Sequence, residues 1–186
     1  MSQKKPNPPV ALNNAATRPK SAGAMRKIRS LFASGVTAVT TALGGRSPEG
    51  GLRLRGVTVS SFSALSLDPP LVLIALANET TMREMIAASG IFAVNILSDD
   101  QEFLSERFAA RAPLVNEEFE GVSYHVEVTG APILEQSIAW YDCRVETTFP
   151  GGDHTIFVGR VEAMGLGDET RRPLVYFANR YVRLKE

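Results

Sequence analysis

The chain has 186 residues, of which 44% are hydrophobic and 22% charged, and its 20 basic residues balance its 20 acidic ones. This length suffices for one sizeable hydrophobic core and is short for two domains. The longest apolar stretch, residues 71–77, is far shorter than the roughly 20 residues of a membrane-spanning helix, so none is expected. The single cysteine, Cys143, excludes a disulfide within this sequence, which fits a reducing cytoplasm.

The positive charges are concentrated at the N-terminal end. Eight basic residues precede Glu49, which is the first acidic residue, so 12 basic and 20 acidic residues remain for the rest of the chain. An acidic body argues against a nucleic-acid-binding core. Residues 1–22 are rich in proline and lack apolar periodicity, so we expect a disordered basic tail there and a folded domain over residues 23–186.

At the start of this domain, apolar residues recur at the spacing of one helix face. This spacing predicts an amphipathic helix whose apolar residues are Met25, Ile28, Leu31 and Phe32. Gly35 supplies a helix stop. β-Branched residues then predict a strand over residues 36–43, and the Gly-rich run at residues 44–51 predicts a mobile loop before a second strand from Leu52. Together these two strands form a predicted hairpin.

A segment dense in hydroxyl groups, residues 56–66, follows the second strand. Pro69-Pro70 ends this region, and the apolar run at residues 71–77 has the length of a buried strand. A polar segment is therefore held between two predicted strands, where its side chains and backbone can face a ligand.

Two short helices are predicted next. Thr81 and Glu84 have the spacing of a capping box, which begins a helix that ends at Gly90. Residues 98–101 repeat this pattern and begin the second helix. Residues 91–97, between the two helices, predict another buried strand.

The C-terminal third is rich in strands. Four are predicted, at residues 122–128, 138–148, 154–164 and 174–184, and Gly151-Gly152 forms a tight connection between the second and third of them. Cys143 lies in one of these strands and is interpreted as a small hydrophobic residue rather than a reactive thiol. Many strands with a few short helices predict a mainly β or α+β fold of the barrel or sandwich type.

The common catalytic motifs are missing from the sequence. His125, His154 and one cysteine are too few for a multi-histidine zinc site, and no metal is expected. No nucleophile elbow, Walker A loop or Gly-x-Gly-x-x-Gly turn is present, so hydrolase, nucleotidase and Rossmann interpretations lack support. A site that binds an organic cofactor remains.

Five segments, in order, resemble the flavin reductase-like, FMN-binding split-barrel family. The hydroxyl-rich segment at residues 56–70, GVTVSSFSALSLDPP, resembles the family's flavin-binding signature. The other four lie at residues 32–41, 90–97, 152–159 and 173–181. The resemblance covers about residues 25–184 and implies a split β-barrel with a few short peripheral helices.

A flavin needs neutral donors and acceptors along its ribityl chain and pyrimidine edge, and the hydroxyl-rich segment can supply them. The resemblance implies flavin contacts from Thr37, Thr58, Val59, Ser60, Ser61, Ser63, Ser66 and Leu67. It also implies phosphate contacts from Thr80, Thr81 and Arg107, because phosphates bind hydroxyls, backbone N–H groups and arginine. Thr81 has the alternative role of a helix cap, and the role of Arg107 stays open.

Three further residues each have two interpretations. Asn95 lies in an apolar strand, where its amide must find hydrogen bonds; the resemblance adds flavin contact as a competing role. By resemblance His154, in Gly-Asp-His, binds the nicotinamide nucleotide rather than being a satisfied surface histidine. Tyr181 is assigned to the cofactor site in the same way, although an aromatic residue in a terminal strand is commonly core. His125 has no motif around it and is interpreted as a surface histidine.

The resemblance implies an NAD(P)H:flavin oxidoreductase that reduces FMN or FAD with NADH or NADPH and needs no catalytic acid or base. It also implies a homodimer and a separate flavin-dependent monooxygenase that receives the reduced flavin. Two alternatives stay open: a reductase that holds FMN tightly and reduces another acceptor, and a non-catalytic flavin-binding protein of the same fold. We expect a cytoplasmic protein with no nucleic-acid or membrane partner.

Overall fold

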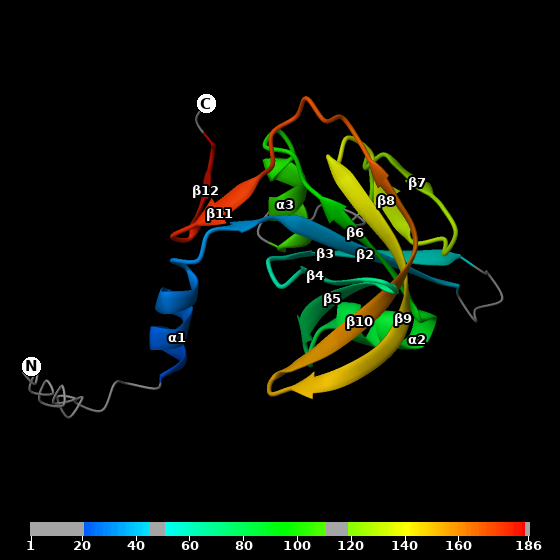
Figure 1. The fold of residues 1–186 in the computed structure, drawn as a ribbon, viewed down its shortest axis with the longest axis horizontal. Coiled ribbons are helices and arrows are strands. Elements are labelled where there is room, and N and C mark those ends of the chain that lie inside the picture. Colours follow the sequence, from blue (N-terminus) through cyan, green and yellow to red (C-terminus); the bar gives the residue numbers. More distant parts are fainter. Residues whose placement is uncertain (1–20, 45–50, 111–118, 185–186) are drawn as a thin grey trace, which may run out of the picture.

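The computed structural model describes residues 21–44, 51–110 and 119–184. Most of the expected tail at residues 1–22 and of the expected loop at residues 44–51 lies outside these ranges, so their disorder and mobility stay predictions. Within the described ranges, antiparallel strands dominate and three short helices lie at the periphery (Figure 1). The mainly β architecture predicted from the sequence is therefore confirmed.

One antiparallel sheet of seven strands carries the fold, in the order β3-β2-β6-β9-β10-β5-β4. The strands are β2 (Thr37–Gly44), β3 (Leu52–Val59), β4 (Ser63–Leu67), β5 (Pro70–Ala77), β6 (Ile91–Ile96), β9 (Ala139–Gly151) and β10 (His154–Leu166). The edge strands β3 and β4 are joined by residues 60–62 alone, so the sheet has to curl until its edges approach each other. Among the described residues no strand pairing closes this gap, and the barrel is split between β3 and β4.

The core lies inside the curled sheet. On β5 the buried residues Val72, Ile74 and Leu76 alternate with more exposed neighbours, as expected for a strand with one face in the core. Phe92 and Phe157 pack against them from β6 and β10. These large side chains account for the apolar runs in the sequence through packing alone.

Cys143 lies in the same core and is fully buried. Burial, followed by the charge of neighbouring Asp142, raises the pKa of its thiol. A thiol that resists ionisation is a poor nucleophile, which agrees with its interpretation as a small hydrophobic residue.

Helix α2 (Thr81–Ser89) contacts β2, β3, β5 and β6, and its buried Met82 and Ile86 belong to the same core cluster as Phe92 and Phe157. Thr80 precedes it in extended conformation, and its Oγ1 accepts a hydrogen bond of 3.3 Å from the backbone N–H of Arg83. The capping residue is therefore Thr80, and the prediction that Thr81 caps the helix is wrong by one position. The helix ends at Gly90 as predicted.

Helix α3 (Glu102–Phe108) begins later than its capping pattern predicts. Ser98 does not cap it: the Ser98 hydroxyl donates to Asp100 Oδ1 over 2.6 Å, and Gln101 Oε1 accepts from the Ser98 backbone N–H. The pattern at residues 98–101 thus forms a closed turn before the helix rather than its first turn.

Two small sheets complete the structure. They contain β1 (Ser34–Gly35) with the hairpin of β11 (Val175–Phe177) and β12 (Arg180–Val182), and β7 (Tyr124–Val126) with β8 (Pro132–Leu134). The single strand predicted at residues 174–184 is wrong, because Ala178 and Asn179 have positive φ angles of 51° and 61° and turn the chain back.

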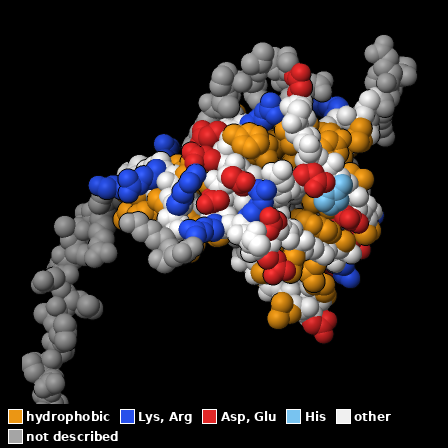
Figure 2. All heavy atoms as spheres, turned by 90° about the horizontal axis from the view of Figure 1, so that it is seen from above, with side chains coloured by type: hydrophobic (Ala, Val, Ile, Leu, Met, Phe, Trp, Pro, Cys, Tyr) orange, Lys and Arg blue, Asp and Glu red, His pale blue; other side chains and the backbone are white. Residues whose placement is uncertain are grey.

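Helix α1 (Ala22–Arg29) projects from the body beside this hairpin (Figure 1). It buries none of its residues, and the predicted apolar face is exposed, with Met25, Ile28, Leu31 and Phe32 between 62% and 79% accessible. Figure 2 shows apolar and basic side chains together where the helix projects. A hydrogen bond of 2.7 Å from the Ala178 N–H to Ser30 O attaches its end to the hairpin turn.

Candidate active site

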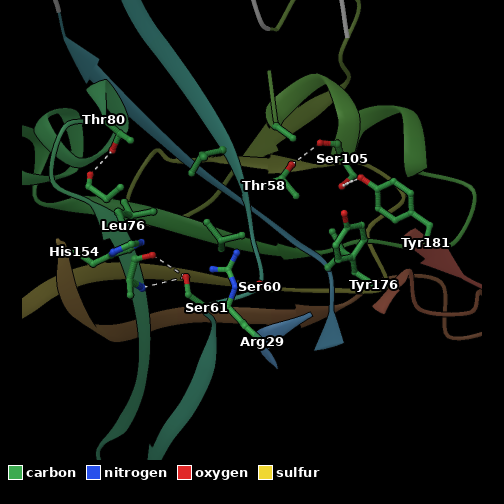
Figure 3. Close-up of a pocket in the computed structure, with 16 residues that line it drawn as sticks. Arg29, Thr58, Ser60, Ser61, Leu76, Thr80, Ser105, His154, Tyr176 and Tyr181 are labelled. Carbon is green, nitrogen blue, oxygen red and sulfur yellow. Dashed lines mark hydrogen bonds between the residues drawn. The ribbon is translucent and has the colours of Figure 1, made fainter. Parts of the chain in front are cut away.

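A pocket of about 310 Å³ opens at the split of the barrel (Figure 3). One side is formed by residues 57–61 and 75–77, from the end of β3, the following turn and β5. We call this side the sheet wall. Arg29, Tyr176 and Tyr181 form the peripheral wall, which belongs to α1 and the β11–β12 hairpin. The pocket therefore joins the main sheet to elements outside it.

Close packing of α3 positions the sheet wall. A Cβ atom on Gly56 would meet two ring carbons of Phe108 at 2.5 Å, so only glycine lets this ring lie against β3. One turn back along α3, Ser105 accepts a hydrogen bond of 2.7 Å from the Thr58 hydroxyl through its backbone oxygen. Together these contacts hold the end of β3 beside α3, where Thr58 and Val59 line the pocket.

The turn after β3 is fixed by one serine and leaves another free. The Ser61 hydroxyl donates to Ala75 O over 2.7 Å and accepts from the Ala75 N–H over 3.3 Å. Ser60 lies in the pocket, is exposed, and its hydroxyl makes no hydrogen bond with another described residue. Ser61 thus shapes the turn, and Ser60 presents an unused donor and acceptor to a ligand.

His154 lies at the first position of β10, where β10 pairs with Ala77 of β5. Gly152, with a φ of 73°, makes the turn that brings it there. The Nδ1–H of His154 donates to Asp153 Oδ1 over 2.7 Å. This hydrogen bond, followed by the attraction of the imidazole, lowers the pKa of Asp153. Because Asp153 engages Nδ1, Nε2 is the ring nitrogen available to a ligand.

The N-terminal end of α2 also reaches the pocket. Thr80 lines it, and the Thr80 hydroxyl donates to Ala77 O over 2.8 Å. Helix N-terminal N–H groups favour anions, so this end suits a polar or negatively charged part of a ligand.

On the peripheral wall, two tyrosines face each other edge to face with ring centroids 5.2 Å apart. The Tyr181 hydroxyl also shares a hydrogen bond of 2.8 Å with Ser105 of α3. This bond attaches the β11–β12 hairpin to the helix that supports the sheet wall. Arg29 supplies a guanidinium group beside them, and none of the lining residues that the structure describes is acidic.

A family model described as "Flavin reductase like domain" matches residues 28–185. The chain belongs to this family. It is therefore an oxidoreductase that reduces a flavin with a reduced nicotinamide, and the resemblance drawn from the five segments is confirmed.

Two bacterial relatives support this membership. The reductase component of 4-hydroxyphenylacetate 3-monooxygenase from Thermus thermophilus is 38% identical over 162 residues, which are 87% of this chain and 95% of that protein. The NADH-dependent flavin reductase StyB of Pseudomonas fluorescens is 34% identical over 84% of this chain and 86% of its own length. Both matches extend over nearly the whole domain.

Solved structures show the same fold. An NADH:FAD oxidoreductase of Streptomyces globisporus, in complex with NAD and FAD fragments, matches with a TM-score of 0.78 at 31% identity. The match covers 90% of this chain and 95% of that one. The split barrel of this flavin reductase is therefore confirmed by structure as well as by sequence.

The chemistry of the pocket fits a flavin. Val57, Val59 and Leu76 offer apolar surface to a flat ring, and Ser60 offers an unused hydroxyl. Among the described strands β3 pairs with β2 alone, and its last three residues, Val57 to Val59, line the pocket. The positively charged Arg29 suits a phosphate.

The structure brings half of the predicted site residues together. Thr58, Val59, Ser60, Ser61, Thr80, His154 and Tyr181 all line the pocket. They come from four separate parts of the chain, namely residues 58–61, Thr80, His154 and Tyr181, so their convergence supports the predicted site. Flavin or nicotinamide contact by each of them stays a prediction.

Asn95 does not line this pocket. Its side chain is fully buried and donates to Ala38 O and Thr40 Oγ1, while its oxygen accepts from the backbone N–H of Leu134 over 2.8 Å. The Asn95 amide thus connects β2, β6 and β8 by hydrogen bonds. Of the two roles that the sequence allowed, this is the structural one rather than flavin contact. Thr37 is likewise buried behind the pocket and donates to Val59 O.

Five further predicted residues lie outside the pocket. On β4, Ser63 and Leu67 are exposed, and Ser66 is half-buried. Thr81 is exposed in the first turn of α2. Arg107 donates to Glu120 O over 2.8 Å and does not line the pocket. A phosphate contact from Arg107 therefore has no support in the geometry.

Sequence reasoning missed Arg29, Ser105 and Tyr176, which all line the pocket. Arg29 was counted within a basic N-terminal segment, and no local pattern separates it from Arg26 and Lys27. A signal did exist for Tyr176, because the segment at residues 173–181 resembles the family and contains it.

Among the described residues, no group of three or more histidine, cysteine, aspartate or glutamate side chains is arranged to hold a metal ion. None of the described helices is long and apolar enough to span a membrane. His125 is half-buried against Trp140 and pairs with Glu135 over 2.9 Å, and it does not line the pocket.

Proposed function

We propose that this flavin reductase binds its flavin in the pocket at the split of the barrel and delivers the reduced flavin to a separate monooxygenase. The observation that carries this proposal is the convergence of the sheet wall, His154 and the peripheral wall around one acid-free pocket. Relatives support the delivery step, since several are named reductase components or subunits of flavin-dependent monooxygenases.

In this arrangement the chain binds and orients the flavin and the nicotinamide nucleotide, and no side chain has to donate or accept a proton. A bound flavin supplies a ring that accepts a hydride from a reduced nicotinamide. The apolar residues of the sheet wall would bind the flavin ring, and the Ser60 hydroxyl would hydrogen-bond a polar group of the flavin. His154 lines the same pocket with Nε2 available, so it would bind the nicotinamide nucleotide. Holding two reactants at the correct distance is itself a large catalytic effect.

We propose NADH as the preferred donor, because three of the relatives are named NADH-dependent reductases. For the acceptor, one of them is named an FAD reductase, and the pocket itself does not separate FMN from FAD. A cytoplasmic location follows from the need for NADH and agrees with the one cysteine being a buried thiol.

We also propose a homodimer. An eight-residue helix is marginal in water unless its apolar side packs on something, yet α1 buries none of its residues. The pocket volume of about 310 Å³ lies at the low end for small-molecule sites, so one chain encloses a flavin only in part. A second copy that covers the apolar side of α1 would add surface beside Arg29.

The activity is tested by titrating purified protein with FMN or FAD and following oxidation of NADH and NADPH. We expect oxidation that depends on flavin and is faster with NADH than with NADPH. When a flavin-dependent monooxygenase and its substrate are added, we expect that substrate to be hydroxylated. Flavin binding without any nicotinamide oxidation would instead support the non-catalytic flavin-binding protein.

The dimer is tested by sedimentation at micromolar concentration. We expect a dimer for the native chain and a shift toward monomer for Ile28→Glu, which places a charge on the exposed apolar side of α1. Lys27→Ala changes the polar side of the same helix and should leave the dimer intact. A native chain that sediments as a monomer with full activity would contradict the proposal.

A further inference from the structure

We propose that Arg29 binds a phosphate group of the nucleotide held in the pocket. This inference rests on the proposed location of the flavin and nicotinamide, and it assigns the charged contact that Arg107 was expected to make. Arg29 is the last residue of α1, and its guanidinium group points into the pocket in Figure 3. A phosphate would therefore be recognised from a helix outside the main sheet.

The charge of Arg29 has no counterpart among the described residues. No hydrogen bond or ion pair joins its side chain to another described residue, and the pocket lining contains no aspartate or glutamate. His154 is the other lining residue that can carry a positive charge, and its Nδ1 is already engaged by Asp153. An unpaired guanidinium in an acid-free pocket attracts anions, and a phosphate matches its planar set of donors.

The positive charge of Arg29 also has a structural explanation, which can be distinguished by experiment from phosphate binding. Cations in the last turn of a helix are stabilised by the helix dipole, and α1 has three of them: Arg26, Lys27 and Arg29. Arg29 lines the pocket, and the other two do not. Replacing Arg29 or Lys27 by a neutral residue removes one positive charge from the last turn of α1 in either case. Ligand binding by the two variants should therefore differ only if Arg29 contacts a ligand.

Apart from Arg29 and His154, the lining residues offer neutral contacts to a phosphate. Thr80 and the first turn of α2 lie at a different end of the pocket from Arg29 (Figure 3). Arg107 is directed to Glu120 O and does not line the pocket. Arg29 is thus the one arginine among the lining residues described, and it is the residue expected to distinguish a phosphorylated ligand from its unphosphorylated analogue.

The first experiment compares FMN with riboflavin, which lacks only the phosphate. Binding is measured by flavin fluorescence for the native protein and for Arg29→Gln, Arg29→Lys and the control Lys27→Gln. If the phosphate belongs to the flavin, Arg29→Gln weakens FMN binding roughly tenfold to a hundredfold and leaves riboflavin binding unchanged. Arg29→Lys keeps the charge without the planar donors and should fall between. Lys27→Gln should bind both flavins like the native chain.

The second experiment detects a phosphate of the nicotinamide nucleotide. NADH oxidation is measured with riboflavin as acceptor, so that NADH is the only phosphorylated ligand. If Arg29 binds that nucleotide, Arg29→Gln lowers kcat/KM for NADH tenfold or more while FMN and riboflavin affinities stay unchanged.

Thermal unfolding without ligand completes the test, because Arg29→Gln and Lys27→Gln should unfold at the same temperature. An Arg29→Gln protein that matches Lys27→Gln in FMN binding and in NADH kinetics overturns the proposal. Failure of the native protein to bind any flavin would instead overturn the proposed function, so the two outcomes are distinguishable.

Discussion

The sheet wall of the pocket belongs to the seven-stranded barrel, whereas the peripheral wall belongs to a helix and a hairpin that lie outside it. Residues 57–61 and 75–77 are held by strand pairing and by α3, which packs its Phe108 ring against Gly56. In the peripheral wall, Tyr176 and Tyr181 of the hairpin are half-buried and pack against a core cluster, whereas Arg29 lies on a helix with no buried residue. The sheet wall is therefore part of the barrel, and the peripheral wall is packed against it through the hairpin but hardly through α1.

This difference separates two tasks. A wall fixed by the core can hold a flavin ring at a constant position, which hydride transfer requires. Helix α1, which buries none of its residues, can move at low free-energy cost, so ligands can enter and leave past it. That property suits an enzyme whose reduced flavin must reach another protein. It also predicts that changes in the sheet wall alter folding and binding together, whereas changes in the peripheral wall alter binding alone.

The largest effect is expected for Gly56→Val. Its side chain would collide with the Phe108 ring, displace α3 from β3 and cost about 3 kcal/mol of folding free energy. Denaturant unfolding and FMN titration should show loss of stability and of flavin affinity together. Gly44→Val is the matched control, since a Cβ at Gly44 meets nothing within 4 Å. Normal flavin affinity in a destabilised Gly56→Val protein would show that the packing of α3 on β3 does not position the flavin pocket.

His154→Ala should weaken use of the nicotinamide without changing flavin binding. One lost hydrogen bond to a charged group is worth about 1.5 to 3 kcal/mol, or roughly tenfold to a hundredfold in kcat/KM for NADH. His125→Ala removes a surface histidine paired with Glu135 and should behave like the native enzyme. If His154 serves only to end the β9–β10 turn, unfolding temperature will fall and both ligand constants will move together.

The sequence predicted most of the sheet wall because local patterns encode it. The apolar run at residues 71–77 and the hydroxyl-rich turn that precedes it specify β5 and the end of β3. Gly151-Gly152 places His154 at the start of β10, as its spacing predicts. In each case the signal lies within a few residues of the feature, so one sequence was sufficient.

The peripheral wall was predicted poorly because its positions depend on contacts distant in the chain. Nothing near Arg29 shows that its helix ends beside a hairpin about 150 residues later, and Arg26 and Lys27 look equivalent. The hairpin turn itself is formed by Ala178 and Asn179, and alanine gives no signal for a positive φ angle. Asn95 is ambiguous for the same reason, since its partners lie on two other strands.

Tyr181→Phe should affect the peripheral wall alone. Removing the hydroxyl deletes the hydrogen bond to Ser105 that attaches the hairpin to α3, which is worth about 0.5 to 1.5 kcal/mol. We expect a twofold to tenfold rise in the flavin Michaelis constant and little change in unfolding temperature. Tyr124→Phe, remote from the pocket, is the control. A lower unfolding temperature with normal flavin kinetics would show that the hairpin belongs to the folding core.

The smallest effect is expected at the ion pair that ties the segment before the hairpin to the turn before α3. The hydrogen bond from Ser98, and then the charge of Arg171, lower the pKa of Asp100 below its ordinary value. A lowered carboxyl pKa contributes stability at neutral pH, and that contribution is lost as the pH falls below about 4 and the group protonates. Asp100 is 56% exposed, so Asp100→Asn should cost less than about 1 kcal/mol.

Urea unfolding at pH 7, 5 and 3 tests this. The difference in free energy of unfolding between Asp100→Asn and the native chain should be constant at the two higher pH values and shrink at pH 3. Asp99→Asn is the control, because its side chain makes no hydrogen bond or ion pair with another described residue. A difference that persists unchanged at pH 3 would mean that the Asp100 side chain stabilises this connection by shape rather than by charge.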